Sequence, residues 1–458
     1  MDLKTSLETP DNVVYDISIS WLSIDTVRQI SEQQCEPVWM LEHRLASLEI
    51  FFRMWLPTRW PDLSAIDFDD IVYYAKWKTW NASNRDDVDP AIKSKFERLG
   101  IPQAEREYLA GAWWQFDSEN VYHKLKSKRA EKWVIFSDMP TAVGEYPELV
   151  KKYFMKLVPK HDHKFAALHG AVWSGGTFIY IPSWVHVTEP LQAYFRMNTL
   201  WWWQFEHTLI VIDDDATWDY IEWCSAPKYN RTSLHAGLVE IHVWKRSKMR
   251  YSSVENRSTN TYNLNTKRAI VDDESTMERV NGNLWSCTTM LYPCTILKWY
   301  KSVWNNIWVV VAWAWQHQDT WSKVIHIWAH SSSTIISKSI SKDGWVSVYR
   351  GIVEFKPSAY HALNSTECDA LMMDDESVST TLPTIISDCE TAVIAHEASA
   401  GRVDEMTLFY LMSRGMDVQQ SMAMIVNGFI SPVVKRLPLE YAGELNKLIE
   451  MEMEWSVW

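Results

Sequence analysis

The feature that most constrains the fold is a stretch of about 230 residues, from Lys164 to Ile394, built from short alternating segments with no helical pattern between them. Examples are Thr177–Ile181, Thr208–Ile212, Leu238–Val243 and Arg250–Val254, which are rich in β-branched and aromatic residues. Strands without intervening helices exclude a doubly wound α/β fold and leave a sandwich, a barrel or a stacked β-solenoid. Periodicity does not choose among these three.

Helical patterns precede the β region. Apolar residues recur at spacings of three and four within Glu36–Met54 and predict an amphipathic helix. A shorter helix is expected over Ile24–Glu32, because Ser23 is a suitable N-cap. We therefore expect a helical region over residues 1–163 and a β core over residues 164–397.

Residues 398–458 return to a helical pattern. A helix is predicted over Glu405–Arg414, before Gly415, and a second over Val418–Asn427, ending before Gly428. A last helix after Pro438 is half apolar and half acidic. It either docks a partner or packs on the chain's own core, and the sequence leaves both open.

Composition and charge narrow the possible partners. There are 45 basic and 58 acidic side chains and a net charge of -13, which argues against binding nucleic acid. No secretory signal begins the chain, and the longest apolar run, Ile307–Trp315, is too short to cross a membrane. We expect a cytoplasmic protein. Its six cysteines include no C-x-x-C pair, so they are expected to be thiols.

Several long stretches of sequence resemble one family. They include AVWSGGTFIYIP at 171–182, PLQAYFRMN at 190–198, SKSISKDG at 337–344 and FYLMSRG at 409–415. These stretches resemble the SufB/SufD family of the SUF system, and SufB-type scaffold subunits in particular. The resemblance runs from about Trp21 to the last residue. It implies a mainly β fold, with a right-handed parallel β-helix core flanked by N-terminal and C-terminal helical regions.

The resemblance also implies a function. SufB-type subunits are scaffolds, not enzymes, on which a transient iron-sulfur cluster is built. The implied partners are the ATPase SufC docked on the C-terminal helices, SufD, a cysteine desulfurase with its sulfur-transfer protein, and apo iron-sulfur acceptor proteins. Reduced flavin is a further possible ligand of the complex. The chain lacks a G-x-x-x-x-G-K-[ST] loop, in keeping with ATP hydrolysis by SufC.

Two cysteines are the principal candidates for chemistry. Cys224 lies in EWCSAP, which resembles the family's E-G-C-T-A-P, whose cysteine accepts persulfide sulfur. Judged by itself, Cys224 is more simply a buried structural thiol. Cys368, in TECDA, matches the cysteine that holds the nascent cluster. Thiolates can act as sulfur nucleophiles and as iron ligands.

Four further residues are carried over from the family. His396 and Glu397 match the second and third positions of an E-H-E triplet of candidate iron ligands, although Ala395 replaces its first carboxylate. Arg196 and Asn198 match polar positions on a sulfur path between the two cysteines. Arg196 could equally be a structural ion-pair partner. The family's Q-N-W is here Glu255–Arg257, which weakens the case for an unchanged path.

Two alternatives remain at this point. One is the SufD-type paralogue, which has the same architecture. The other is a β-solenoid enzyme acting on polysaccharide, which would need paired carboxylates on neighbouring turns. The dense acidic cluster of the β region, Asp213–Asp215, has the composition of a solvated turn.

Tryptophan is unusually frequent, with 28 residues against 14 glycines. The resemblance places glycine at 13 of these positions: Trp21, Trp184, Trp203, Trp223, Trp285, Trp299, Trp304, Trp313, Trp315, Trp321, Trp345, Trp455 and Trp458. We hypothesise that a codon, UGA, is read as glycine by the host. The substituted residues should then lie at turns or strand ends, with outward indoles and some positive φ angles. Trp39 and Trp173 match family tryptophans, and Trp173 should be buried with a partner for its indole N–H.

Overall fold

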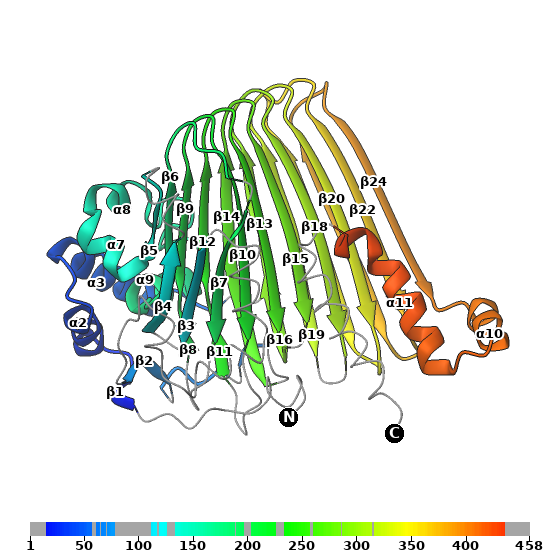
Figure 1. Ribbon diagram of the computed structural model, residues 1–458, viewed down its shortest axis with the longest axis horizontal. Helices are drawn as coiled ribbons and strands as arrows, with labels where there is room; N and C mark the ends of the chain where they lie inside the picture. Colours follow the sequence, from blue (N-terminus) through cyan, green and yellow to red (C-terminus); the bar gives the residue numbers. More distant parts are fainter. Residues whose placement is uncertain are drawn as a thin grey trace.

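Two long β-sheets face each other and enclose the interior of the molecule (Figure 1). The computed structural model describes residues 15–435, except for residues 57–60, 65, 70, 78–110, 117–118, 126–132, 188, 197–202, 226–232, 257–259, 285 and 314–315. Through the core the chain alternates between the sheets, so that strands from successive turns stack in parallel, giving a β-solenoid of about seven turns. The predicted mainly β fold with a β-helix core is confirmed.

Each sheet runs the length of the solenoid, and its neighbouring strands are hydrogen-bonded in the following spatial order. The ten-stranded sheet contains β24 (Val393–Arg402), β22 (Leu363–Met372), β20 (Ser332–Ser341), β18 (Val303–Ala312), β15 (Thr276–Leu284), β13 (Lys248–Asn256), β10 (Thr217–Ser225), β7 (Leu191–Arg196), β3 (Gly111–Phe116) and β4 (Glu119–Leu125). The twelve-stranded sheet contains β23 (Val378–Ser387), β21 (Val346–Phe355), β19 (His317–His326), β16 (Thr288–Leu291), β14 (Thr261–Val271), β12 (Leu238–Val243), β9 (His207–Ile212), β6 (Thr177–Ile181) and β5 (Ile135–Asp138), with β8 (Trp203–Gln204), β11 (Ser233–His235) and β17 (Cys294–Leu297) beside this path.

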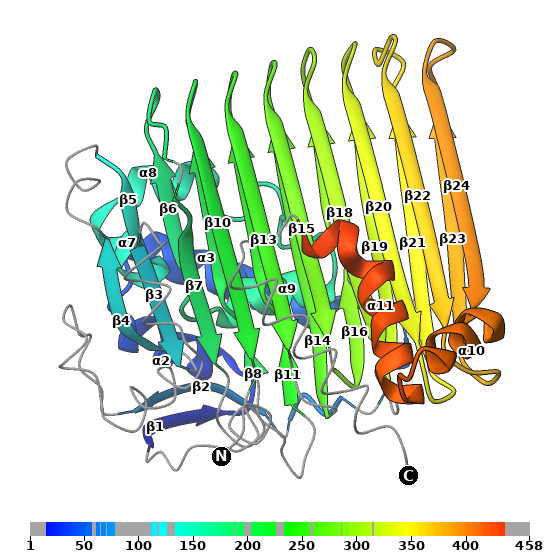
Figure 2. The same ribbon diagram turned by 45° about the vertical axis from the view of Figure 1, so that its right-hand side comes forward.

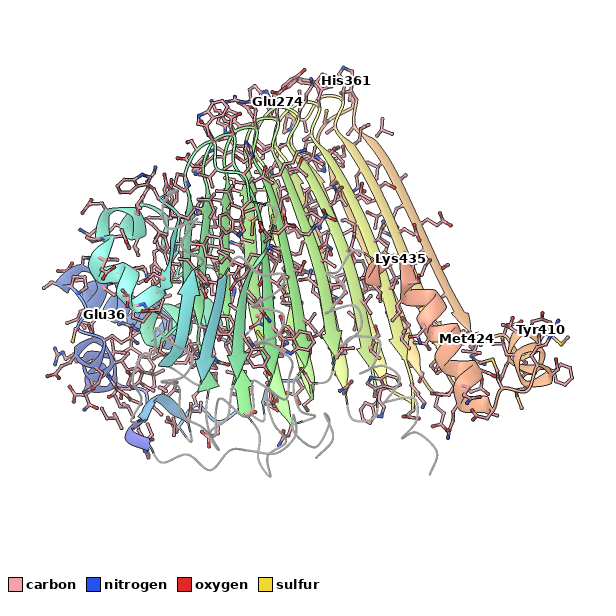
Figure 3. All side chains as sticks on the ribbon, in the orientation of Figure 1. Glu36, Glu274, His361, Tyr410, Met424 and Lys435 are labelled. Atoms are coloured by element: carbon pink, nitrogen blue, oxygen red, sulfur yellow. The ribbon has the colours of Figure 1, made fainter. Side chains whose placement is uncertain are left out.

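One corner of the solenoid is built from residues in the left-handed conformation. Among the described residues, seven lie there, about 30 residues apart, with φ between 52° and 67°: Trp184, Asp215, Arg246, Glu274, Lys301, His330 and His361. The backbone amide of each of the first six donates to a carbonyl of the next turn, as from Arg246 to Asp273 at 2.8 Å. Glu274 and His361 mark this corner in Figure 3. We call this series the corner ladder.

Helices and two short strands cover the N-terminal end. They are β1 (Tyr15–Ser20), α2 (Ile24–Gln33), α3 (Val38–Arg53), β2 (Val72–Trp77), α7 (Met139–Glu145), α8 (Pro147–Tyr153) and α9 (Lys164–Val172). Ser23 is the N-cap of α2, as predicted, and accepts a hydrogen bond from the amide of Thr26. The region also contributes β3, β4 and β5 to the two solenoid sheets, so it is more than the helical unit that its periodicity suggested.

Buried charges fasten the N-terminal elements together. Arg44 on α3 is fully buried, donates to Glu36 at 2.6 and 2.7 Å, and also donates to the backbone carbonyl of Trp173 at 2.9 Å. The carboxylate of Glu240 on β12 accepts hydrogen bonds from three backbone amides of the segment 155–158. Because each buried charge has partners, the helical end is fixed to the solenoid at little desolvation cost.

Two helices lie at the other end (Figure 2). They are α10 (Glu405–Ser413) and α11 (Val418–Val434). The prediction that the second helix ends before Gly428 is wrong: α11 continues through Gly428 and Pro432. The reason is tertiary packing, since Ile430 and Val433 beyond the glycine are buried and α11 packs on β18. The helix expected after Pro438 lies outside the described residues.

The tryptophans behave in two ways. Trp21 and Trp184 have φ angles of 68° and 67° and exposed indoles, as the glycine hypothesis predicts. Trp223 and Trp313, by contrast, are buried, and Trp223 lies within β10. Trp345 is half-buried just before β21, while Trp285 and Trp315 fall outside the described residues.

Trp173, the control for the glycine hypothesis, meets only one of its two expectations. Trp173 is fully buried as expected, but its indole N–H has no hydrogen-bond partner among the described residues.

All six cysteines are free thiols. Within the described part of the chain, no helix has the length and apolar character needed to span a membrane.

Candidate functional site

The parallel register aligns the inward side chains of the ten-stranded sheet into rows along the solenoid, because alternate residues of each strand face inward. The Cys368 row consists of Glu222, Ser253, Asn281, Trp308, Ser337 and Cys368. The Cys224 row consists of Cys224, Glu255, Asn283, Val310, Ser339 and Ala370. The His396 row consists of Tyr220, Tyr251, Arg279, Asn306, Ile335, Thr366 and His396.

Both candidate cysteines therefore face the interior, and both are buried. Cys224 lies on β10 and Cys368 on β22, and β13, β15, β18 and β20 lie between these strands. Five steps at about 4.8 Å each separate the two strands by roughly 24 Å. Sulfur held at Cys224 cannot reach Cys368 by direct thiol contact. Because successive residues of a strand face opposite sides, Trp223 lies on the other face of β10 from Cys224.

Charged side chains surround Cys224. The thiol lies 3.8 Å from the carboxylate of Glu222. Lys267, on β14 of the opposite sheet, reaches across the interior to Glu255 at 2.8 Å and to Glu222 at 3.6 Å. Burial acts to lower the pKa of Lys267, but the two carboxylates outweigh it and the pKa is raised. Burial raises the pKa of Glu222, against the effect of Lys267.

Amide and hydroxyl groups complete this polar section. Asn265 donates to Glu255 at 3.0 and 3.2 Å, and Asn263 donates to the same carboxylate. Lys267 donates to the hydroxyl of Ser253 at 3.0 Å. The interior at Cys224 is therefore a connected hydrogen-bonded network, which low dielectric strengthens.

An apolar section interrupts the interior between the cysteines. Leu291, Trp308 and Val310 are buried and form a cluster of their own. Trp308 and Val310 belong to the rows of Cys368 and Cys224, and lie next to Asn281 and Asn283 in register. The polar interior around Cys224 is thus separated from the hydroxyl-lined section that leads through Ser337 to Cys368.

Cys368 and His396 lie on the inner faces of neighbouring strands. His396 on β24 pairs in register with Thr366, two residues before Cys368. Both ring nitrogens of His396 are buried and have no hydrogen-bond partner among the described residues. Burial lowers the pKa of His396, which keeps the ring neutral near pH 7, and it raises the pKa of Cys368 to about 12. A neutral imidazole beside a thiol is a plausible iron-binding pair.

The other candidates lie elsewhere. Glu397 is exposed on the outer face of β24, opposite Glu367, and does not join Cys368 and His396. Arg196 ends β7 and pairs in register with Ser225, directly after Cys224. Asn198 is outside the described residues. No group of three metal-ligating side chains occurs in the described part of the chain.

The C-terminal end of the solenoid presents apolar side chains to solvent. They are Leu363, Val378, Leu382, Ile385, Ile386 and Val393 on β22, β23 and β24. No residue of α10 is buried, and Met406, Phe409 and Tyr410 are exposed on it. Tyr410 projects from this helix in Figure 3. Exposed apolar patches of this kind are typical of protein-binding surfaces.

Sequence reasoning missed Lys267, Glu222 and Arg279, which lie inside the solenoid with the two cysteines. In β14 the polar residues Asn263, Asn265 and Lys267 alternate with Tyr262 and Leu264. This pattern is typical of a strand with one solvated face. Here the apolar side packs against the N-terminal elements, and the polar side is the interior.

Comparison with known proteins covers most of the chain. A family profile described as "SUF system FeS cluster assembly, SufBD core domain" matches residues 195–429, and "SufBD protein N-terminal region" matches residues 115–193. An iron-sulfur cluster assembly SufBD family protein of Staphylococcus aureus (strain MRSA252) is 47% identical over 436 residues, 95% of this chain and 94% of its own length. Those of Staphylococcus saprophyticus and Staphylococcus haemolyticus are each 46% identical, with the same coverage.

Proposed function

Because the chain belongs to the SufBD family of iron-sulfur cluster assembly proteins, we propose that it is the SufB-type scaffold subunit. In this role sulfur is accepted as a persulfide at Cys224, and the nascent cluster is held at Cys368. The cluster is cargo, to be passed to apo iron-sulfur proteins. A SufD-type subunit would have the same fold without holding the cluster.

The observation that carries the proposal is the pair formed by Cys368 and His396. The His396 imidazole is partly buried, and its two buried nitrogens have no hydrogen-bond partner among the described residues, which is costly unless they bind something else. Its neutral state and the thiol of Cys368, two residues further along the neighbouring strand, provide two of the ligand types that iron accepts. The pair occupies β24 and β22, the last two strands of the ten-stranded sheet, at the end of the solenoid where a partner chain would supply the remaining ligands.

Iron and sulfide content of the purified assembly tests the cluster site. Cys368→Ser and His396→Ala should each lower the iron bound per complex, because losing a ligand weakens metal binding directly. Cys389→Ser is the matched control, since Cys389 is also a buried thiol but follows β23 on the opposite sheet. Unchanged iron and sulfide in the Cys368 and His396 variants would instead support the SufD-type alternative.

Persulfide labelling tests the acceptor thiol. A cysteine desulfurase with its sulfur-transfer protein should label the wild-type chain and leave Cys224→Ser unlabelled. Cys294→Ser, which removes another buried thiol, should be labelled normally. Equal labelling of Cys224→Ser and wild type would overturn this assignment.

Two surfaces suit the proposed partners. We assign α10 to SufC, because all of its residues are accessible and its exposed side chains are large and apolar. The apolar end formed by β22, β23 and β24 is assigned to SufD. Phe409→Glu should weaken SufC binding at least tenfold without affecting SufD, whereas Ile385→Glu should do the reverse. Loss of both partners in either variant would contradict the assignment of separate surfaces.

A polysaccharide-active enzyme is not supported. Asp213–Asp215 lie at a turn of the corner ladder, and Asp215 accepts a hydrogen bond from Arg246 at 2.7 Å. This side chain is engaged structurally. ATP hydrolysis is assigned to SufC, and a reduced flavin, if bound, to the assembled complex.

A further inference from the structure

Arg279 is a fully buried cation without an acceptor among the described residues. It lies on β15 and faces the interior, between the strands that carry the two cysteines. None of its three side-chain nitrogens has a hydrogen-bond partner, and its guanidinium makes no ion pair among the described residues. The ring of Tyr251 lies 5.8 Å from the guanidinium carbon.

The neighbouring Asn281 also offers a buried N–H group that has no acceptor among the described residues. Asn281 follows on the same face of β15, and its side-chain nitrogen has no acceptor among the described residues. Its orientation follows from the network, because Lys267 donates to the hydroxyl of Ser253, which then donates to the oxygen of Asn281 at 2.8 Å. The amide nitrogen is thereby left as a second free donor beside Arg279.

Nearby carboxylates do not satisfy Arg279. Glu222 and Glu255 are shared by Lys267, and neither lies within ion-pair distance of the guanidinium. Burial lowers the pKa of Arg279 to about 10, so it remains charged at neutral pH. A buried charge of this kind is strongly destabilising unless an opposite charge accompanies it.

We propose that Arg279 and Asn281 form a site for a small monovalent anion of the hydrosulfide class inside the solenoid. A guanidinium and an amide N–H offer donors only, which selects for an anion and against a cation. The site lies directly before the apolar cluster, since Asn281 pairs in register with Trp308. It would hold hydrosulfide between Cys224 and that barrier. An external thiol is the two-electron reductant: its thiolate attacks the inner sulfur of the Cys224 persulfide, hydrosulfide leaves, and a second thiol resolves the mixed disulfide to restore the Cys224 thiol. The identification of the anion as sulfur rests on the proposed function, whereas the anion site itself does not.

Bromide tests the anion site directly, because it resembles hydrosulfide in charge and size and scatters anomalously. Crystals of the full chain soaked in sodium bromide should show an anomalous peak within hydrogen-bond range of Arg279. Arg279→Met should abolish it, with Arg279→Gln as a second neutral variant where the Met variant does not fold. No peak in the wild type, or an equal peak in the neutral variants, would overturn the site.

Anaerobic competition with sodium hydrosulfide then identifies the natural ligand. Hydrosulfide should reduce the bromide peak at Arg279, and a peak that persists undiminished would overturn the identification as sulfur. In solution, bromide should raise the melting temperature of the wild type more than acetate at equal ionic strength, and this difference should vanish in Arg279→Met. Failure of the proposed function would appear separately, as unchanged persulfide labelling in Cys224→Ser.

Discussion

The two inward-facing cysteines lie in the same solenoid but in different surroundings. Cys224 is enclosed by a buried network in which Lys267 bridges two carboxylates. Cys368 has its lysine on the outer face of the sheet, where Lys338 contacts Glu367 and Asp369. The same combination of one lysine and two carboxylates thus lies inside the solenoid near Cys224 and on its outer face near Cys368. The interior around Cys224 therefore contains buried ion pairs, whereas the interior around Cys368 leaves a thiol and an imidazole available to a metal.

The largest expected effect comes from removing the two lysines. Lys267→Met leaves Glu222 and Glu255 buried without their cation and should lower the free energy of unfolding by about 3–5 kcal/mol. Lys338→Met leaves Glu367 and Asp369, which both retain access to solvent, and should cost about 1 kcal/mol or less. Urea denaturation of both variants measures the difference. Equal losses would show that the two charge clusters are equivalent after all.

Thiol reactivity gives the second test. Because burial raises the pKa of Cys368 to about 12 from its ordinary value of 9.0, its thiolate fraction at pH 8 falls roughly a thousandfold. Alkylation by iodoacetamide, followed by peptide mass spectrometry, should be slower at Cys368 by at least that factor than at exposed Cys35. The Cys368 rate should keep rising up to about pH 12. A plateau near pH 9 would contradict the raised pKa.

These two regions also show what the sequence could reveal. The mainly β class followed from the alternating pattern, whereas the choice of a β-helix followed from the family resemblance. Strand periodicity shows which residues share a face, but not which face is the interior. Periodicity could not distinguish the interior from solvent, so the buried Lys267 network and Arg279 were missed. Alternation implies that His396 and Glu397, as neighbours in one strand, face opposite sides, but which of the two faces inward depends on the register of β24 against β22.

A smaller effect is expected at the corner ladder. Trp184 is left-handed and exposed, so Trp184→Gly should relieve backbone strain and raise the free energy of unfolding by about 1 kcal/mol. Trp328 is the matched control, since it is also exposed but is absent from the left-handed residues. Trp328→Gly should bring no gain. A gain of equal size in both variants would mean that the indole, and not the backbone, is responsible.

The identity of the tryptophans in the native host is a separate question with a direct answer. If the codon hypothesis is correct, intact protein from that host should be lighter than the sequence as written, by one tryptophan-to-glycine difference per reassigned position. The buried Trp223 and Trp313 argue for testing each position by peptide sequencing. A mass equal to the written sequence would refute the hypothesis.

The corner ladder has a consequence for how such a protein can change length. Six successive turns each meet the next through a left-handed residue and an amide-to-carbonyl bond, whatever side chain occupies the position. A whole turn could therefore be gained or lost by duplication or deletion without new joints, as in other repeat architectures. Each such event would move the two cysteines apart or together by about 4.8 Å. The distance between the two thiols is therefore set by the whole number of turns that separate them.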